Sequence, residues 1–136
     1  IKEKATHTEV KDPYFTFRDN EAACKKILQE FGLDPEDSHI VNGHVPVKDG
    51  QGESPIKANG KLLVIDGGMS PAYHKSTGLH GYTLIYNSYG LVLVAHKAID
   101  SIDEIIKNDL DMSSETRAHK HKVRRKRVAD TNDGKL

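Results

Sequence analysis

The sequence has one cysteine, no tryptophan and no long uninterrupted run of hydrophobic residues. A single cysteine, Cys24, cannot form an intramolecular disulfide bond, so the chain is not a small disulfide-stabilised scaffold. A lone thiol also suits a reducing compartment. No apolar segment approaches the roughly 20 residues that a membrane-spanning helix needs, and no secretory signal is visible. We therefore expect a cytoplasmic protein that does not enter a membrane.

The chain also lacks an excess of charge of either sign. Its 20 Lys and Arg residues balance 20 Asp and Glu residues, so net charge alone predicts no polyanionic partner. A length of 136 residues suits one small domain. Because the sequence opens without Met and without a helix or strand start signal, we expect a fragment of a longer polypeptide. We divide it into an extended lead-in (1–18), an α/β core (19–110) and a basic C-terminal segment (111–136).

Apolar periodicity predicts a helix over residues 19–32. Asp19 is the expected N-cap and Gly32 the expected C-terminal stop. The stripe of Ala23, Ile27 and Phe31, widened by Cys24 and Leu28, should face the core. Cys24 on this stripe is interpreted as a buried core residue, because a free cysteine behaves as a small hydrophobe.

Four short runs are typical of strands: 39–42, 61–66, 81–87 and 91–96. The run 61–66 is continuously apolar, as in a strand covered on both faces, and 91–96 should likewise be buried. The segment "NSYG" between the last two runs has hairpin turn chemistry, and 43–60 is interpreted as a long loop. A second helix is expected over 101–108, with Ser101 and Glu104 as a capping box. The fold class is α/β (α+β), with a mixed or antiparallel sheet and flanking helices.

One histidine stands in an unusual context, where the strand "HIVN" runs into Gly43, His44 and Pro46. Gly43 permits a sharp turn, and Pro46 prevents a helix from following. The rigid end of a buried strand, which we expect here, suits a metal-binding imidazole. A turn histidine bonded to a neighbouring carbonyl explains the same pattern and, from these residues alone, is the favoured interpretation.

The motifs "GHVPVK", "GESPIKA", "VIDGG" and "TGLHGYTLI" together resemble the C-terminal part of the class III fructose-1,6-bisphosphatases. These are bacterial enzymes of the calcineurin-like metallophosphoesterase superfamily, and the resemblance covers essentially the whole chain. It implies part of a calcineurin-like sandwich and hydrolysis of the 1-phosphate of fructose 1,6-bisphosphate to fructose 6-phosphate in gluconeogenesis. It also implies a binuclear Mn²⁺ centre, whose ions would clamp the phosphoryl oxygens and activate a water.

By position, the resemblance makes His44 a metal ligand. Of the superfamily's other metal motifs, Gly-Asp-x-x-Asp and Gly-Asn-His-Asp/Glu do not occur in this sequence, and Asp-x-His occurs only once, as Asp37-Ser38-His39. We therefore expect most ligands to lie in the remaining N-terminal part of the parent chain. The fragment alone should be inactive, and we assign it no catalytic residue.

Two further residues are substrate-binding candidates. Lys48, four residues after His44, would meet a substrate phosphate as a point charge, with a solvated loop lysine as the alternative. Asp66 ends a predicted strand beside Gly67 and Gly68, which permit a tight backbone approach. A place lining the metal cleft and a simple Asx turn are both consistent with Asp66.

The other histidines are assigned no ligand role. His96 is interpreted as a satisfied, half-buried residue, and His80 opens a strand between small residues. The remaining ones have no specific context or lie in the polar ends of the chain: His7, His39, His74, His119 and His121.

The basic run 117–127 supports a function of another class. It gathers seven Lys and Arg residues, which is a reasonable phosphate-binding footprint. Nucleic-acid modules usually add aromatic stacking residues, and this run has none apart from histidine rings. The alternative function is a non-catalytic interaction module that binds a polyanion through this run.

Overall fold

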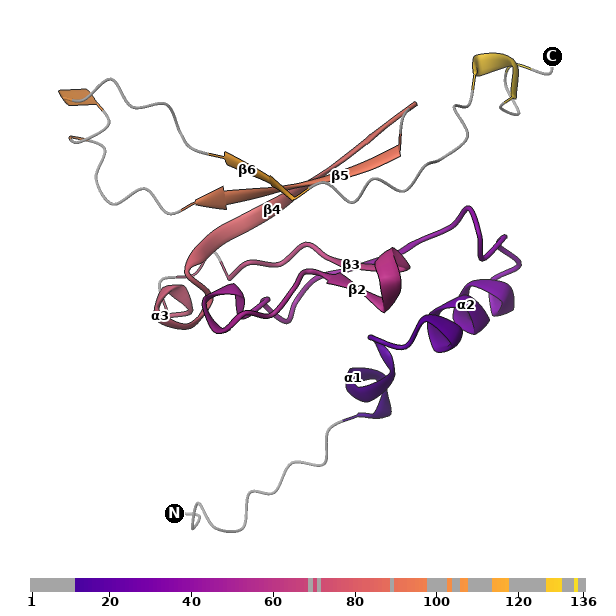
Figure 1. The fold of residues 1–136 in the computed structure, drawn as a ribbon, viewed down its shortest axis with the longest axis horizontal. Helices are drawn as coiled ribbons and strands as arrows, with labels where there is room; N and C mark the ends of the chain where they lie inside the picture. Colours follow the sequence, from indigo (N-terminus) through magenta and orange to yellow (C-terminus); the bar gives the residue numbers. More distant parts are fainter. Residues whose placement is uncertain are drawn as a thin grey trace, which may run out of the picture.

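The computed structural model describes most of the chain between residues 12 and 97 and short pieces beyond it (Figure 1). The described residues are 12–68, 70, 72–88, 90–97, 103, 106–107, 114–117, 127–130 and 134. Several predictions fall outside these ranges: His7, the capping box of Ser101 and Glu104, His119, His121 and the basic run from 118 to 126. Of the predicted second helix, the described residues Asp103, Ile106 and Lys107 are helical.

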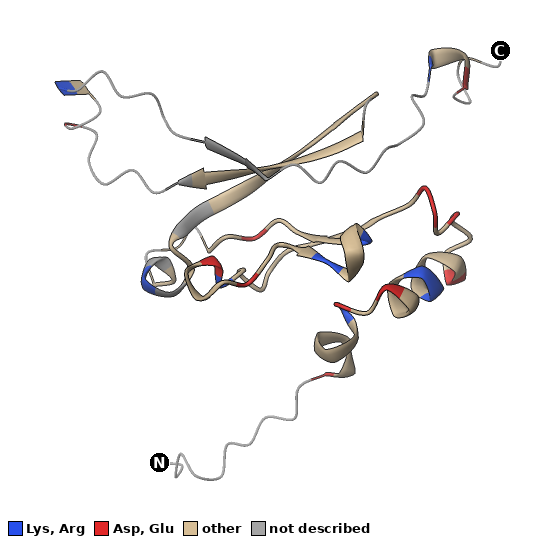
Figure 2. Ribbon diagram, in the orientation of Figure 1, with Lys and Arg blue, Asp and Glu red and all other residues tan. Residues whose placement is uncertain are grey.

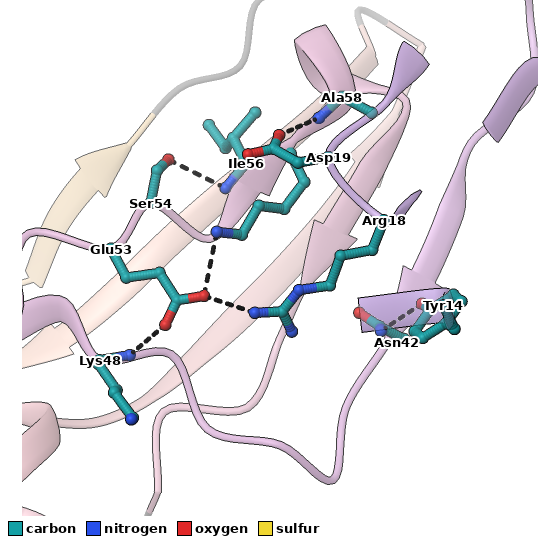
Figure 3. Close-up of polar contacts among 10 residues, drawn as sticks. Tyr14, Arg18, Asp19, Asn42, Lys48, Glu53, Ser54, Ile56 and Ala58 are labelled. Atoms are coloured by element: carbon teal, nitrogen blue, oxygen red, sulfur yellow. Dashed lines mark hydrogen bonds and ion pairs between the residues drawn. The ribbon is translucent and has the colours of Figure 1, made fainter. Parts of the chain in front are cut away.

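Helix α1 (Pro13–Phe17) lies inside the predicted lead-in, so an extended conformation was the wrong prediction for these residues. Pro13 stands in the first turn, where its missing N–H leaves no hydrogen bond unmade. The Asp12 side chain caps the helix by accepting from the Tyr14 N–H at 2.8 Å. The Tyr14 hydroxyl accepts from Asn42 Nδ2 at 2.7 Å, which ties the helix to the residue just before Gly43 (Figure 3).

Helix α2 (Glu21–Glu30) is capped by Asn20 and not by Asp19, which corrects the prediction. Asn20 Oδ1 accepts from the Ala23 N–H at 3.0 Å. Asp19 instead accepts from the Ala58 N–H at 2.8 Å and so fastens the start of α2 to a distant loop (Figure 3). Gly32 ends the helix with φ +70°, as predicted.

The buried face of α2 consists of Cys24 and Leu28, which are 1% and 3% exposed. The predicted stripe was wrong at Ile27 and Phe31, which are exposed. The interpretation of Cys24 as a core residue is confirmed, and burial raises the pKa of its thiol.

The first sheet is mixed and has the order β1-β3-β2. β1 (Ile40–Asn42) pairs in parallel with β3 (Leu62–Val64), and β2 (Ile56–Lys57) pairs antiparallel with β3. All three residues of β3 are buried, as its continuous apolar run predicted. Strand β2 lies inside the segment 43–60, which was predicted to be a loop, so that prediction was wrong at β2. The short 3-10 helices η2 (Asp49–Gln51) and η3 (Ala58–Gly60) flank this strand.

The second sheet is antiparallel and has the order β4-β5-β6. β4 (Leu79–Asn87) and β5 (Gly90–Lys97) form the predicted hairpin, and β6 (Ser114–Arg117) pairs with β5. The short helix α3 (His74–Thr77) precedes β4, and η4 (Val128–Asp130) lies near the end of the chain.

One face of the hairpin packs on the first sheet, which lies between the hairpin and helices α1 and α2 (Figure 1). Leu93 and Ala95 of β5 are buried, whereas Val92 and Val94 on the other face are only half-buried. Full burial of the strand 91–96 was therefore a wrong prediction. The shared core contains these residues: Cys24, Val47, Ala58, Leu62, Val64, Tyr82, Leu93 and Ala95.

The observed architecture is α/β, with one mixed sheet, one antiparallel sheet and a few short helices. The predicted fold class is confirmed at this level. Among the helices that the structure describes, none combines the length and apolar character needed to cross a membrane.

Candidate metal and phosphate site

His44 lies on a short loop that leaves the sheet at the carboxyl end of β1. Both ends of this loop are fastened to the chain that follows β3. The Ile65 N–H donates to Asn42 O at 2.9 Å, and the Val47 N–H donates to Asp66 O at 2.9 Å. Residues 43–46 therefore protrude between two backbone hydrogen bonds, with the His44 side chain exposed. The predicted position of His44 at a strand end is confirmed, although β1 is half-buried to exposed and not the buried strand that was expected.

The backbone of His44 adopts φ +71°, in the left-handed region. Histidine enters this region more readily than most residues, but for any residue with a Cβ it costs about 1 kcal/mol or more. The surrounding hydrogen bonds hold the residue there. Strain of this kind often accompanies functional sites, where the structure fixes the direction of one side chain.

His44 and Lys48 line the same hollow, which has a volume of about 320 Å³. The sequence placed both residues on one loop, and the structure brings them to one cavity. Val45, Pro46, Tyr73 and Thr77 complete its lining. Sequence reasoning missed Tyr73 and Thr77, because they come from α3 and its approach, about 30 residues along the chain.

Asp66 borders a neighbouring hollow of about 300 Å³, which it shares with Gly43, Gly67 and Gly81. Its Oδ1 accepts from the Gly68 N–H at 2.9 Å, which is the Asx turn that the sequence offered as an alternative. The turn leaves the half-buried carboxylate beside Gly43, since a Cβ built on Gly43 would lie 3.9 Å from Asp66 Cβ. Asp66 therefore lies in the turn and also lines a cavity next to His44.

The first glycine after Asp66, Gly67, makes a close backbone contact. A Cβ built on Gly67 would lie 2.6 Å from Gly81 Cα and 2.7 Å from Gly81 N. The segment that follows β3 therefore lies directly against the start of β4. The tight approach that the sequence predicted for "DGG" is thus confirmed, and it joins the two sheets beside the site.

Glu53 anchors the loop that carries Lys48, as Figure 3 shows. Its Oε2 accepts from the Lys48 N–H at 3.0 Å. Its Oε1 lies 2.8 Å from Arg18 Nη2 and 3.0 Å from Lys57 Nζ. Sequence reasoning missed this cluster, because Arg18 is 35 residues away; the only local signal is the spacing of Glu53 and Lys57.

The pKa of the Glu53 carboxyl is lowered by this cluster. Burial acts in the opposite direction and is the largest single effect. The hydrogen bonds from the Lys48 N–H and the Lys57 ammonium, with the charges of Lys57 and Arg18, together outweigh it. The folded state therefore favours the charged carboxylate.

We predict that Glu53→Gln destabilises the protein by about 2 kcal/mol at pH 7, since it weakens charge-assisted hydrogen bonds of a partly buried group. Because the pKa of Glu53 is lowered on folding, its ionised form stabilises the folded protein at pH values above the unfolded-state pKa of 4.5. This stabilisation is lost as the pH falls through the lower pKa of the folded state. Urea unfolding of both proteins at pH 7 and pH 3 should show the difference in stability shrinking in acid.

Glu36→Gln is the matched control for Glu53→Gln. Glu36 pairs with Lys25 at 2.8 Å, but its side chain is 70% exposed, so solvent screens the pair. Its substitution should change stability much less. A similar loss from both substitutions, or a Glu53 effect that is the same at both pH values, would contradict the assignment.

The described residues do not provide a complete metal site. Among them, no group of three or more His, Cys, Asp and Glu side chains is arranged to hold a metal ion. A binuclear Mn²⁺ centre needs several carboxylate oxygens and imidazoles. His44 can offer one imidazole and Asp66 lies nearby, so this part of the chain alone does not fit the two-metal group.

The structure also locates other residues considered in the sequence. His96 is half-buried, and its Nε2 lies 2.7 Å from Thr83 Oγ1, which confirms the interpretation of a satisfied histidine. His39 is half-buried before β1, and the backbones of His74 and His80 lie in α3 and β4.

Charged residues of both signs are interspersed along α2 and the loops that join the strands of the first sheet, whereas the segment 79–96 carries none (Figure 2). The basic run contributes only Arg117, at the end of β6, and Arg127 to the described residues. Arg127 lies 3.9 Å from Asp130, and both side chains are well exposed. The polyanion interpretation therefore stays a prediction.

The whole chain, residues 1–136, matches the family model described as Firmicute fructose-1,6-bisphosphatase. Among curated proteins, "Fructose-1,6-bisphosphatase class 3" of Listeria monocytogenes serotype 4b is 58% identical over 134 residues, covering 98% of this chain and 20% of that protein. "Fructose-1,6-bisphosphatase class 3 1" of Clostridium beijerinckii is 60% identical with the same coverage. The chain thus spans about one fifth of the length of these curated relatives. No solved structure matches it.

Proposed function

Because this chain belongs to the Firmicute fructose-1,6-bisphosphatase family, we propose that it is the C-terminal part of an enzyme that removes the 1-phosphate of fructose 1,6-bisphosphate. The observation that carries the proposal is the family match over all 136 residues, together with 58% identity to a protein named for this activity. The product would be fructose 6-phosphate, and the reaction would serve gluconeogenesis in the cytoplasm.

Within this enzyme, His44 contributes one ligand to a binuclear Mn²⁺ centre. The exposed imidazole on a firmly held strand end supports this role, because a ligand has to be fixed before the ion arrives. The described residues lack the other ligands, so the remaining N-terminal part of the parent chain supplies them. The two sheets would then form part of a calcineurin-like sandwich.

Lys48 and Asp66 contribute to substrate binding in this proposal. Lys48 shares the hollow of His44, so its ammonium can meet a phosphate held near that imidazole. Asp66 lies in the neighbouring hollow, on the other side of Gly43. A carboxylate is placed there to accept hydrogen bonds from sugar hydroxyls, whereas it would repel a phosphate.

We predict that the full-length protein releases phosphate from fructose 1,6-bisphosphate when Mn²⁺ is present, and that residues 1–136 alone release none. The isolated chain should fail because a single imidazole does not hold a two-metal centre. A phosphate-release assay on both proteins, each with Mn²⁺ and with a chelator, tests this. Chelator-resistant release by the full-length protein would contradict the metal requirement, and metal-dependent release by the isolated chain would contradict the assignment of missing ligands.

A further inference from the structure

The hollow beside His44 is lined by residues of two chemical kinds. His44 and Lys48 suit a metal ion and a phosphate. The other lining residues are Val45, Pro46, Tyr73 and Thr77, of which Tyr73 is aromatic. A site for a bare phosphate has no use for an aromatic ring, whereas a ligand with an anionic end and an apolar face matches both kinds of residue.

The backbone of Tyr73 is held on both sides. Its N–H donates to Ser70 O at 2.9 Å. Its carbonyl accepts from the Thr77 N–H at 2.9 Å and from Thr77 Oγ1 at 3.0 Å. Thr77 is itself buried, at 1% exposed. These contacts fix the point from which the tyrosine side chain departs.

A glycine is required where α3 approaches the site. Gly68 has φ +71°, and a Cβ built on it would lie 2.8 Å from Tyr73 Cβ and 3.1 Å from Thr77 Cγ2. The same Cβ would lie 3.2 Å from Pro46 Cβ, on the loop of His44. The absence of a side chain at Gly68 thus lets Tyr73 come close to this loop.

Despite these constraints, Tyr73 is 48% exposed. A tyrosine that served only the core would be covered, because its ring gains most from burial. Here a firmly held backbone carries an exposed tyrosine that lines a cavity. Such a ring can pack against a ligand with little loss of conformational entropy, since few torsions remain to be fixed.

We propose that Tyr73 and Lys48 form a subsite for a phosphorylated sugar, in which the tyrosine ring packs on the apolar C–H face of the sugar and the ammonium binds a phosphate. The subsite rests on the proposed phosphatase function and deepens it. Tyr73 would make the enzyme prefer sugar phosphates to phosphates that lack a ring. Tyr73 contributes to substrate recognition and takes no direct part in hydrolysis.

The test uses the full-length protein with the substitutions Tyr73→Ala, Tyr73→Phe and Tyr86→Ala. Tyr86 is the control, because it is a 67% exposed tyrosine near the tip of the β4–β5 hairpin and does not line the hollow. We expect Tyr73→Ala to raise KM for fructose 1,6-bisphosphate about tenfold with little change in kcat. Tyr73→Phe keeps the ring, so its KM should stay near the wild-type value, as should that of Tyr86→Ala.

Inorganic phosphate serves as the ringless probe. Its inhibition constant should be unchanged in Tyr73→Ala, because it does not touch the ring; a parallel rise would indicate a collapsed hollow and overturn the subsite. An unchanged KM in an active Tyr73→Ala protein would also overturn it. If Tyr73→Ala does not fold, Tyr73→Leu replaces it, because leucine keeps apolar bulk without a flat ring. The same rise in KM is then expected of Tyr73→Leu. A wild-type protein that does not hydrolyse the sugar bisphosphate overturns the proposed function itself, and the subsite with it.

Discussion

Gly67→Ala should loosen the chain around His44 and abolish phosphatase activity of the full-length protein. The added methyl group would lie 2.6 Å from Gly81 Cα and 2.7 Å from Gly81 N. Both atoms belong to the backbone at the start of β4, so no side-chain rotation can relieve the clash. Forced overpacking of this kind costs about 3 kcal/mol. The two sheets must separate locally, and the Asp66 carbonyl that holds the Val47 N–H must move with them.

Hydrogen–deuterium exchange of the full-length protein measures this effect. The amides of Val47 and Ile65 bond across the base of the His44 loop, so they report its local opening. A loss of about 3 kcal/mol corresponds to exchange about 100-fold faster. Gly32→Ala is the control: a Cβ on Gly32 meets nothing within 4 Å, so this substitution adds only the strain of alanine at φ +70° and no clash. Gly32→Ala should lower the local stability by about 1 kcal/mol, and faster exchange should be confined to the end of α2. Unchanged protection of Val47 and Ile65 in Gly67→Ala would show that the sheets do not depend on this contact.

The correct sequence predictions depend on residues close together in the chain. Gly32 ends α2, the continuous apolar run gives buried β3, and Asn87 pairs with Gly90 at the end of the β4–β5 hairpin. The position of His44 at a strand end also followed from its neighbours. In each case one local property, such as a left-handed glycine or an apolar run, decides the structure.

The wrong or missing predictions depend on contacts between distant residues. Asp19 and Asn20 are equally good caps, and the choice falls to Asn20 because Asp19 bonds the Ala58 N–H 39 residues away. Strand β2 has only two residues, too few to show an alternating pattern. The cluster of Glu53 with Arg18 likewise joins segments that no local pattern connects.

The candidate site shows the same division. The sequence could place His44 and Lys48 on one loop, but Tyr73 and Thr77, which line the same hollow, come from α3 and the residue before it. Gly68 decides how close α3 approaches, and its role depends on Tyr73, Thr77 and Pro46 together. The contribution of Tyr73 and Thr77 to the cavity therefore could not be derived before the fold was known.

His44→Ala should lower kcat of the full-length protein by more than about 100-fold and reduce the Mn²⁺ that it retains. Loss of groups that merely orient a metal ligand already costs 10–100-fold, so loss of a ligand itself should cost more. Lys48→Ala removes one charge from an exposed side chain and should mainly raise KM, by about tenfold or less. Steady-state kinetics and metal analysis of both variants measure the difference. Equal losses would rule out the ligand assignment.

The left-handed backbone of His44 requires two further variants. Alanine at φ +71° keeps the strain of about 1 kcal/mol that a Cβ causes there, so the loop could relax once the imidazole is lost. His44→Gly removes the imidazole without that strain, so activity regained in it would assign the loss to backbone conformation. His96→Ala controls for the removal of a half-buried histidine elsewhere, since His96 contacts Thr83. If His44 is a ligand, Ala and Gly at position 44 are equally inactive and poor in Mn²⁺, while His96→Ala keeps both properties.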